Sequence, residues 1–277
     1  MTSSALEKPP SGWVKTRERP IQGISLLVTQ IWAIISADLR KLRHDPLEVI
    51  MRGIQPALWL VIFGEAMGRL HSMPTGGIPY LTYLAPGILA QSVVFISIFY
   101  GLTLIWERDL GLLQKFLTVP IPRWGLILGK MLSSGVRGLS QAIIIMLLAL
   151  VLGIHFHDDL PVILLVMLVS IMGAVFFAGL SMSIASLVKT RERFMGIGQL
   201  MTMPLFFASS ALYPVAIMPP WLKVLATVNP LSYMVNALRS LLLFGGSRDL
   251  AVDLSVLLLG DLVMLVLCSW LYPRAAA

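Results

Sequence analysis

The chain has 277 residues, of which 57% are hydrophobic and only 13% are charged, and its formal net charge is +7. Soluble domains carry roughly 25% charged residues, so this composition excludes an ordinary soluble protein and makes lipid the solvent for most of the surface. In a chain this apolar, the positive charge indicates a membrane surface rather than nucleic acid. The single cysteine, Cys268, excludes a disulfide within the chain.

The N-terminal part of the chain divides into a tail and an amphipathic segment. Residues 1–21 are polar, which predicts a disordered cytoplasmic tail without a cleaved signal peptide. In 22–45, apolar residues such as Leu27 and Ile31 recur at helical spacing, while Asp38 and neighbouring basic residues crowd the end. We therefore predict a helix lying in the membrane interface. A soluble helix packed on the protein is the alternative.

The rest of the chain, 46–277, reads as an all-α integral membrane domain. Six apolar stretches are long enough to cross a bilayer. The predicted spans are 47–68, 80–105, 125–154, 160–188, 194–213 and 250–272. Between the last two, the segment 214–246 is apolar but interrupted by prolines, so it predicts a pair of short re-entrant helices in the outer membrane face.

The distribution of basic residues predicts the orientation of these spans. With the N-terminus inside, fourteen Lys and Arg residues fall in the inner segments and four in the outer loops. Positive charge collects on the cytoplasmic side of membrane proteins. Both termini are therefore predicted to be cytoplasmic.

The loop 107–124 is the longest charged interruption in the first half of the chain. Leucines within it, beginning at Leu110 and Leu112, form a short amphipathic pattern that Pro120 and Pro122 would end. It joins the second and third predicted spans, so force applied by a cytoplasmic partner would reach both. The sequence predicts that this loop receives such a partner.

Motifs for chemistry within the chain are sparse. The phosphate-binding pattern GxxxxGK[ST] does not occur, so we expect no cofactor on this chain and no ATP binding by it alone. His155 and His157, next to Asp158 and Asp159, are consistent with a metal site or a solvated turn. We expect neither catalysis nor a metal site.

Two ionisable residues fall inside predicted spans, Arg137 in the third and Asp261 in the sixth. Intramembrane charges are costly and mark either structural pairs or functional paths. Arg137 and Asp261 are therefore expected either to pair with each other or to face a water-filled path. Gln91, Gln141 and Gln199 are expected to hydrogen-bond between helices.

Aromatic residues in the first, second and fifth spans are candidates for a substrate pathway, with core packing as the alternative interpretation. They are Trp59, Phe63, Phe95, Phe99, Phe206 and Phe207.

Two stretches, in this order and with six spans, resemble a known family. The first contains Glu107, Gly111, Leu117, Thr118, Pro120, Arg123, Trp124, Leu128, Gly129 and Lys130. The second contains Tyr213-Pro214, Met218-Pro219, Trp221-Leu222, Asn229-Pro230-Leu231-Ser232-Tyr233 and Ala237-Leu238-Arg239. Arg137 and Gln141 also match. Nearly the whole chain resembles ABC-2-type permeases, the membrane subunits of ATP-binding-cassette exporters, above all the daunorubicin-resistance and nodulation-factor export groups. Val119, between Thr118 and Pro120, departs from the family pattern.

The resemblance implies a pathway for an amphipathic or lipid-like substrate (a drug, a lipid or a glycan) in a bacterial cytoplasmic (inner) membrane. It implies a second permease copy and two cytoplasmic ABC ATPase subunits, which bind ATP and Mg. It also implies that the loop after the second span contains a coupling helix, and that the N-terminal interfacial helix is a connecting helix. The expected coupling residues are Glu107, Arg108, Gly111, Leu112, Phe116, Leu117 and Pro120.

Two other classes of function compete with this reading. An ion-gradient-driven transporter predicts midplane acids and inverted repeats, of which only Asp261 is present. A structural subunit of a membrane complex is the other alternative.

Overall fold

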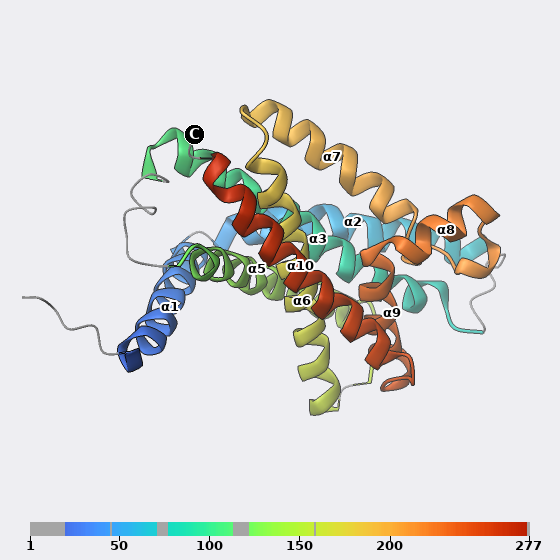
Figure 1. Ribbon diagram of the computed structural model, residues 1–277. Helices are drawn as coiled ribbons and strands as arrows, with labels where there is room; N and C mark the ends of the chain where they lie inside the picture. The colour runs from blue at the N-terminus through green and yellow to red at the C-terminus, as the bar shows by residue number, and fades with distance from the viewer. Residues whose placement is uncertain (1–19, 45, 71–76, 113–121, 158, 276–277) are drawn as a thin grey trace, which may run out of the picture.

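The computed structural model describes residues 20–44, 46–70, 77–112, 122–157 and 159–275, and within them it is helical without strands. The all-α prediction is therefore confirmed for these residues. The elements, shown in Figure 1, are α1 (Pro20–His44), α2 (Pro46–Leu70), α3 (Tyr80–Asp109), α5 (Arg123–Val151), α6 (Leu160–Ala185), α7 (Arg191–Phe207), the 3-10 turn η1 (Val215–Ile217), α8 (Pro220–Val228), α9 (Pro230–Phe244) and α10 (Leu250–Ala275). The predicted tail, 1–21, lies almost wholly outside the described residues.

Four helices are long and apolar enough to cross a membrane: Tyr80–Asp109, Arg123–Val151, Leu160–Ala185 and Leu250–Pro273. They correspond to the predicted second, third, fourth and sixth spans. The other two predicted spans correspond to α2 and α7, which do not meet these limits among the described residues. Four charged residues lie along α2, and α7 has only 17 residues. Six spans therefore remain a prediction.

Several helix boundaries differ from the sequence prediction for local reasons. The helix predicted over 194–213 ends at Phe207, and the chain then turns irregularly as far as Tyr213. The second predicted span continues to Asp109, so the loop predicted over 107–124 begins inside a helix. In 214–246, Asn229 ends α8 and its side chain accepts a hydrogen bond from the Leu231 amide, which starts α9.

Helix α3 occupies the centre of the bundle, where it packs against α2, α5, α6, α7 and α9. Close approach depends on small residues. A Cβ added to Gly101 would lie 2.3 Å from the Ser181 Oγ of α6, and one added to Gly138 would lie 2.6 Å from the Ala174 Cβ. Small residues at these positions therefore permit tight helix contacts.

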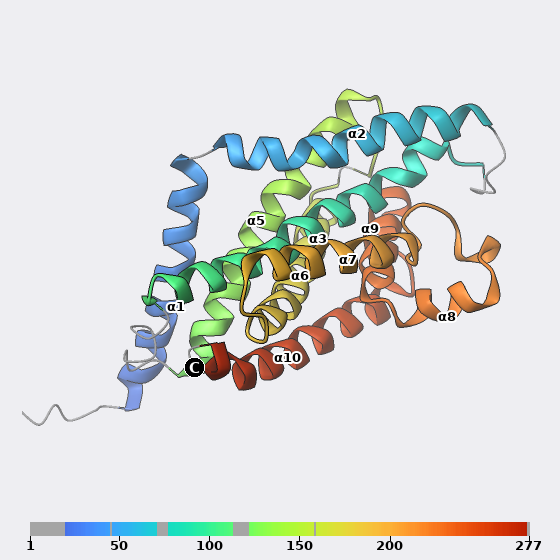
Figure 2. The same cartoon turned by 90° about the horizontal axis from the view of Figure 1, so that it is seen from above.

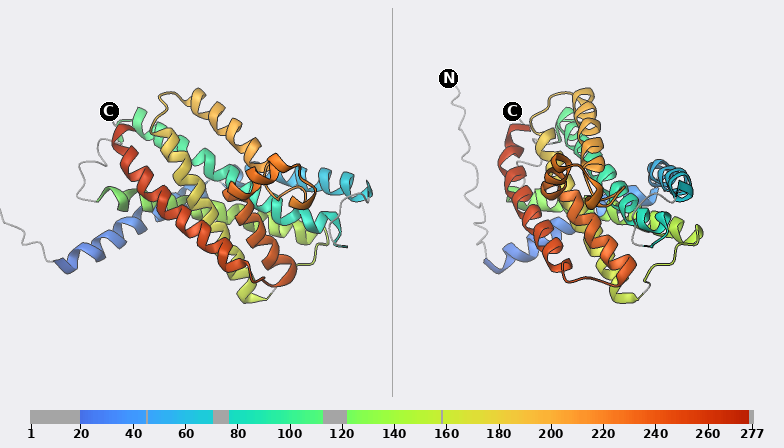
Figure 3. Two further views of the ribbon diagram at one scale, coloured as in Figure 1. Left: turned by 45° about the vertical axis from the view of Figure 1, so that its right-hand side comes forward. Right: turned by 90° about the vertical axis from the view of Figure 1, so that its right-hand side faces the viewer.

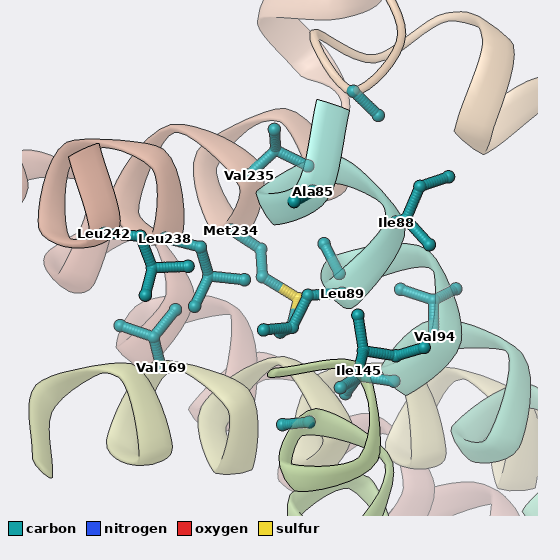
Figure 4. Packing of buried hydrophobic residues seen from close by; sticks show 14 of the residues in the cluster. Ala85, Ile88, Leu89, Val94, Ile145, Val169, Met234, Val235, Leu238 and Leu242 are labelled. Atoms are coloured by element: carbon teal, nitrogen blue, oxygen red, sulfur yellow. The ribbon is translucent and has the colours of Figure 1, made fainter. Parts of the chain in front are cut away.

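The main hydrophobic core lies where α3, α5, α6 and α9 meet (Figure 4). Met234 of α9 reaches toward Leu89 of α3 in this view. A Cβ at Gly173 of α6 would lie 2.3 Å from the Met234 sulfur, so the glycine makes room for this side chain. Through this contact α9, which is too short to be a candidate span, is packed firmly onto the spanning helices.

Helix α1 runs steeply across the directions of α2 and α10 in Figure 2 and packs mainly against α5. Figures 1 and 3 place α1, the C-terminal end of α10 and the α6–α7 connection toward one end of the bundle. Helix α8 and the junction of α8 with α9 lie toward the other end. The segments predicted to be cytoplasmic therefore gather away from those predicted to be outside. The membrane placement of α1, α8 and α9 remains a prediction.

Candidate functional site

The C-terminal end of α3 carries the described part of the predicted coupling loop. The Leu110 amide donates to the Trp106 carbonyl at 3.0 Å, and the Gly111 amide donates to the Arg108 carbonyl at 2.9 Å. Gly111 has a φ of +67°, the left-handed conformation that glycine adopts at little cost and that commonly ends helices. Gly111 thus turns the chain out of α3.

Glu107, a predicted coupling residue, forms an ion pair with Lys130 of α5. The Lys130 side chain is only 5% exposed and that of Glu107 is 23% exposed, so the pair is largely removed from solvent. Breaking such a pair leaves a buried charge poorly compensated. The carboxylate of Glu107 therefore fixes the end of α3 to the start of α5.

Arg108 and Asp109 connect the same end of α3 to the segment that joins α6 to α7. The Arg108 guanidinium donates to the carbonyls of Val188 at 3.0 Å and Lys189 at 2.6 Å. Arg191 donates to the Asp109 carboxylate at 2.8 and 3.1 Å. Two predicted cytoplasmic segments, distant in sequence, are thereby held together.

An exposed apolar surface adjoins these polar contacts. Trp106, Leu110 and Leu112 are 49%, 72% and 36% exposed. Apolar side chains beside a polar rim are typical of protein interaction sites. The remaining predicted coupling residues, Phe116, Leu117 and Pro120, lie outside the described residues.

Arg137 of α5 has an acidic partner on α1. Its Nη2 donates to Asp38 Oδ1 of α1 at 3.1 Å, and the Tyr100 hydroxyl of α3 donates to Asp38 Oδ2 at 2.8 Å. The guanidinium also lies 5.4 Å from the centre of the Tyr100 ring. Arg137 therefore pairs with Asp38 of α1, a partner that neither of the two alternatives for this residue included. The only signal for this pair in the sequence is an acidic residue, Asp38, among the basic residues at the end of the predicted interfacial helix. It could compensate the charge of an arginine within a span.

Asp261 lies on α10, and its Oδ1 is buried without a hydrogen-bond partner among the described residues. The His155–His157 turn is held by the His157 amide, which donates to the Leu242 carbonyl at 3.0 Å. The part of the chain that the structure describes contains no group of three or more His, Cys, Asp or Glu residues arranged for a metal. Asp158, which the metal interpretation required, lies outside that part.

Four of the six predicted pathway aromatics form one cluster between α2 and α7. Trp59 stacks on Phe63 with ring centres 4.7 Å apart, and it meets Phe206 and Phe207 edge-on at 6.1 and 6.4 Å. Phe206 is 2% exposed and packs within the hydrophobic core, whereas Phe207 is 40% exposed. The other two, Phe95 and Phe99, form a separate pair on α3 with ring centres 4.8 Å apart.

Arg239 of α9 fixes the irregular segment after α7. Its Nη2 donates to the Ser210 carbonyl at 2.8 Å, and its guanidinium lies 3.9 Å from the centre of the Tyr83 ring. Burial lowers the pKa of Arg239, while Tyr83 and Tyr80 act in the opposite direction. Tyr80 also donates to the Leu212 carbonyl at 3.0 Å, so 208–213 is held from two helices. Arg239 belongs to the second family-like stretch, but its partners are too distant in the sequence for these contacts to be predicted.

We expect Arg239→Met to lower the free energy of unfolding by about 1–3 kcal/mol, because the buried Ser210 carbonyl loses its donor. Arg239→Lys should recover only part of this loss, since an ammonium lacks the planar fork of the guanidinium. Denaturant unfolding of the chain in detergent would measure both. Arg248→Met, a change at an exposed position, is the control. Equal stabilities for Arg239→Met and the control would show that Arg239 does not fix this segment.

Comparisons with known proteins agree with this architecture. A model of a family described as "ABC-2 type transporter" matches residues 29–243. The chain is 28% identical over 221 residues to "Putative transport permease ycf38" of Cyanophora paradoxa, covering 77% of this chain and 74% of that protein. It is 25% identical over 240 residues to "Daunorubicin resistance ABC transporter permease protein DrrB1" of Streptomyces coeruleorubidus, covering 84% and 83%. It is 24% identical over 220 residues to "Probable doxorubicin resistance ABC transporter permease protein DrrC" of Mycobacterium tuberculosis, covering 79% of each.

Proposed function

The chain belongs to the ABC-2 type transporter family, and we propose that it forms the transmembrane pathway of an ATP-driven exporter in a bacterial cytoplasmic (inner) membrane. Members of this family are membrane subunits of ABC transporters rather than the ATPase, and they work with ABC ATPase subunits. In this proposal a second permease copy completes the pathway. Two ATPase subunits on the cytoplasmic side bind the ATP and Mg.

The network at the end of α3 is the observation that carries the coupling part of the proposal. Glu107 links α3 to α5, while Arg108 and Asp109 link it to the α6–α7 connection. A subunit that pushes on the α3–α5 loop would thus move three spanning helices together. The exposed Leu110 and Leu112 supply an apolar contact for that subunit. Glu107 acts as a positioning residue in this scheme, because its carboxylate faces Lys130.

An amphipathic substrate fits the aromatic surface of α2 and α7. Trp59, Phe63 and Phe207 are partly exposed beside the buried Phe206, and aromatic faces bind both apolar and cationic groups. Two relatives are named for resistance to daunorubicin and doxorubicin. We therefore propose a drug-like or lipid-like substrate that passes this surface.

Transport in sealed vesicles tests the proposal. The full chain would be reconstituted with the cytoplasmic ATPase that co-purifies with it, and doxorubicin movement would be followed by fluorescence. We expect movement that requires hydrolysable ATP and continues when ionophores collapse all ion gradients. Movement driven by an ion gradient without ATP would instead support a secondary transporter. If no ATPase co-purified and no substrate moved, the proposal would be overturned in favour of a structural subunit.

A further inference from the structure

A cavity of about 310 Å³ lies between α1, α3 and α5, away from the cluster of Trp59, Phe63, Phe206 and Phe207, and the Glu107–Lys130 pair forms part of its wall. A second cavity of about 360 Å³ adjoins it and shares Lys41, Tyr100, Thr103 and Glu107 with it, and Arg137 lines this second part. One wall is apolar, with Ile34 from α1 and Leu126 from α5. The other wall is polar and charged. The cavity is therefore amphipathic.

The charges on the walls do not cancel. Among the described lining residues, Asp38 is paired with Arg137 and Glu107 with Lys130. Lys41 is the third cation. Its Nζ lies 3.9 Å from Asp38 Oδ1 and its side chain is 75% exposed, so this contact contributes little. The two cavities thus have one positive charge in excess, at their mouth, on a side chain that is able to move.

The position of this charge agrees with a lipid ligand. Lys41 belongs to the basic last turn of α1, together with Arg43 and His44, all of them exposed. Basic residues on an interfacial helix attract anionic lipids, and basic pockets between membrane helices bind their headgroups. A soluble inorganic anion would make no favourable contact with the apolar wall of Ile34 and Leu126.

We propose that the cavity binds the phosphate headgroup of an anionic phospholipid from the cytoplasmic leaflet. Lys41 contacts the phosphate, and the apolar wall contacts the first part of an acyl chain. The lipid thereby fills the space between α1 and the spanning helices α3 and α5. This site does not depend on the exported substrate, so it stands whether or not the proposed export is correct.

Lipid retention by the full-length chain tests the proposal. The protein would be embedded in phosphatidylcholine nanodiscs containing some phosphatidylglycerol, extracted in mild detergent, and its bound lipids counted by native mass spectrometry. We expect the wild type to retain phosphatidylglycerol. Lys41→Gln should weaken this binding about fivefold, the change expected for one basic residue at the membrane surface. Lys41→Arg should preserve it, and the exposed Lys41 side chain makes misfolding of these variants unexpected.

Arg43→Gln is the matched control, because Arg43 lies in the same exposed turn but does not line either cavity. It should leave retained phosphatidylglycerol near the wild-type level. Equal losses in Lys41→Gln and Arg43→Gln would show diffuse attraction to α1 and overturn the cavity site. Unchanged retention in Lys41→Gln would overturn it as well. Complete displacement of the lipid by inorganic phosphate would show that the acyl chain contributes nothing to binding, and it would overturn the lipid site as well.

Discussion

Glu107→Ala is expected to lower the free energy of unfolding by about 3–5 kcal/mol and to abolish ATP-driven export. The stability falls because the 5%-exposed Lys130 side chain loses its carboxylate partner. Export is lost because the end of α3 is no longer fixed to α5, so movement of the coupling loop does not reach both helices. Denaturant unfolding in detergent and ATP-dependent doxorubicin transport in vesicles would measure the two effects.

Two control variants separate the ion pair from a general loss of charge. Glu192→Ala removes an exposed carboxylate at the start of α7 and should change stability by less than about 0.5 kcal/mol. Exchanging the partners, with Glu107→Lys and Lys130→Glu together, should recover part of both stability and export. If Glu107→Ala retained full export, the ion pair would have no part in coupling.

Asp38→Ala is expected to lower the free energy of unfolding by about 3–5 kcal/mol, because Arg137 loses its carboxylate and the Tyr100 hydroxyl loses its acceptor. A double-mutant cycle with Arg137→Met should give a coupling energy of about 0.5–3 kcal/mol. Denaturant unfolding in detergent would measure the two single variants and the double variant. The result would establish that α1 is attached to the bundle through this pair.

The same assay distinguishes the two candidate partners of Arg137. Asp261→Asn combined with Arg137→Met should be additive within about 0.5 kcal/mol, because these residues share no contact among those described. Strong coupling between Asp261 and Arg137, with none between Asp38 and Arg137, would contradict the arrangement seen here.

Tyr100→Phe should lower the free energy of unfolding by about 1.5–3 kcal/mol, the value of a hydrogen bond to a charged group.

Local sequence signals predicted much of the fold. Apolar length predicted the four long apolar helices, amphipathic spacing predicted α1, and the prolines within 214–246 predicted the pair of short helices α8 and α9. Boundaries were less accurate because hydropathy does not distinguish an apolar helix from an apolar turn. The segment 208–213 is apolar enough to extend α7, yet Arg239 holds its carbonyls in an irregular path. That contact joins residues far apart in the sequence.

The candidate site was predicted only in part, for a related reason. The predicted loop lies next to the end of α3, although the helix runs to Asp109 and past the predicted end of the second span, and four of the aromatics do meet. The partners of the charges were missed. Choosing Asp38 or Asp261 for Arg137 requires the angle at which α1 crosses α5, which no periodicity encodes. Glu107 carried the same ambiguity, because an acid at a helix end can face a partner protein or a neighbouring helix.

Cross-linking at Leu112 tests the central claim, that a cytoplasmic ATPase drives this chain through the end of α3. Cys268→Ser removes the single native thiol, and Leu112→Cys then places a thiol on the exposed surface. Leu225→Cys on α8, at the opposite end of the bundle, is the control. We predict that a thiol-directed cross-linker joins only the Leu112→Cys variant to the ATPase and stops export. A Leu112→Cys chain that exported normally and never cross-linked to the ATPase, while Leu225→Cys did, would contradict the account.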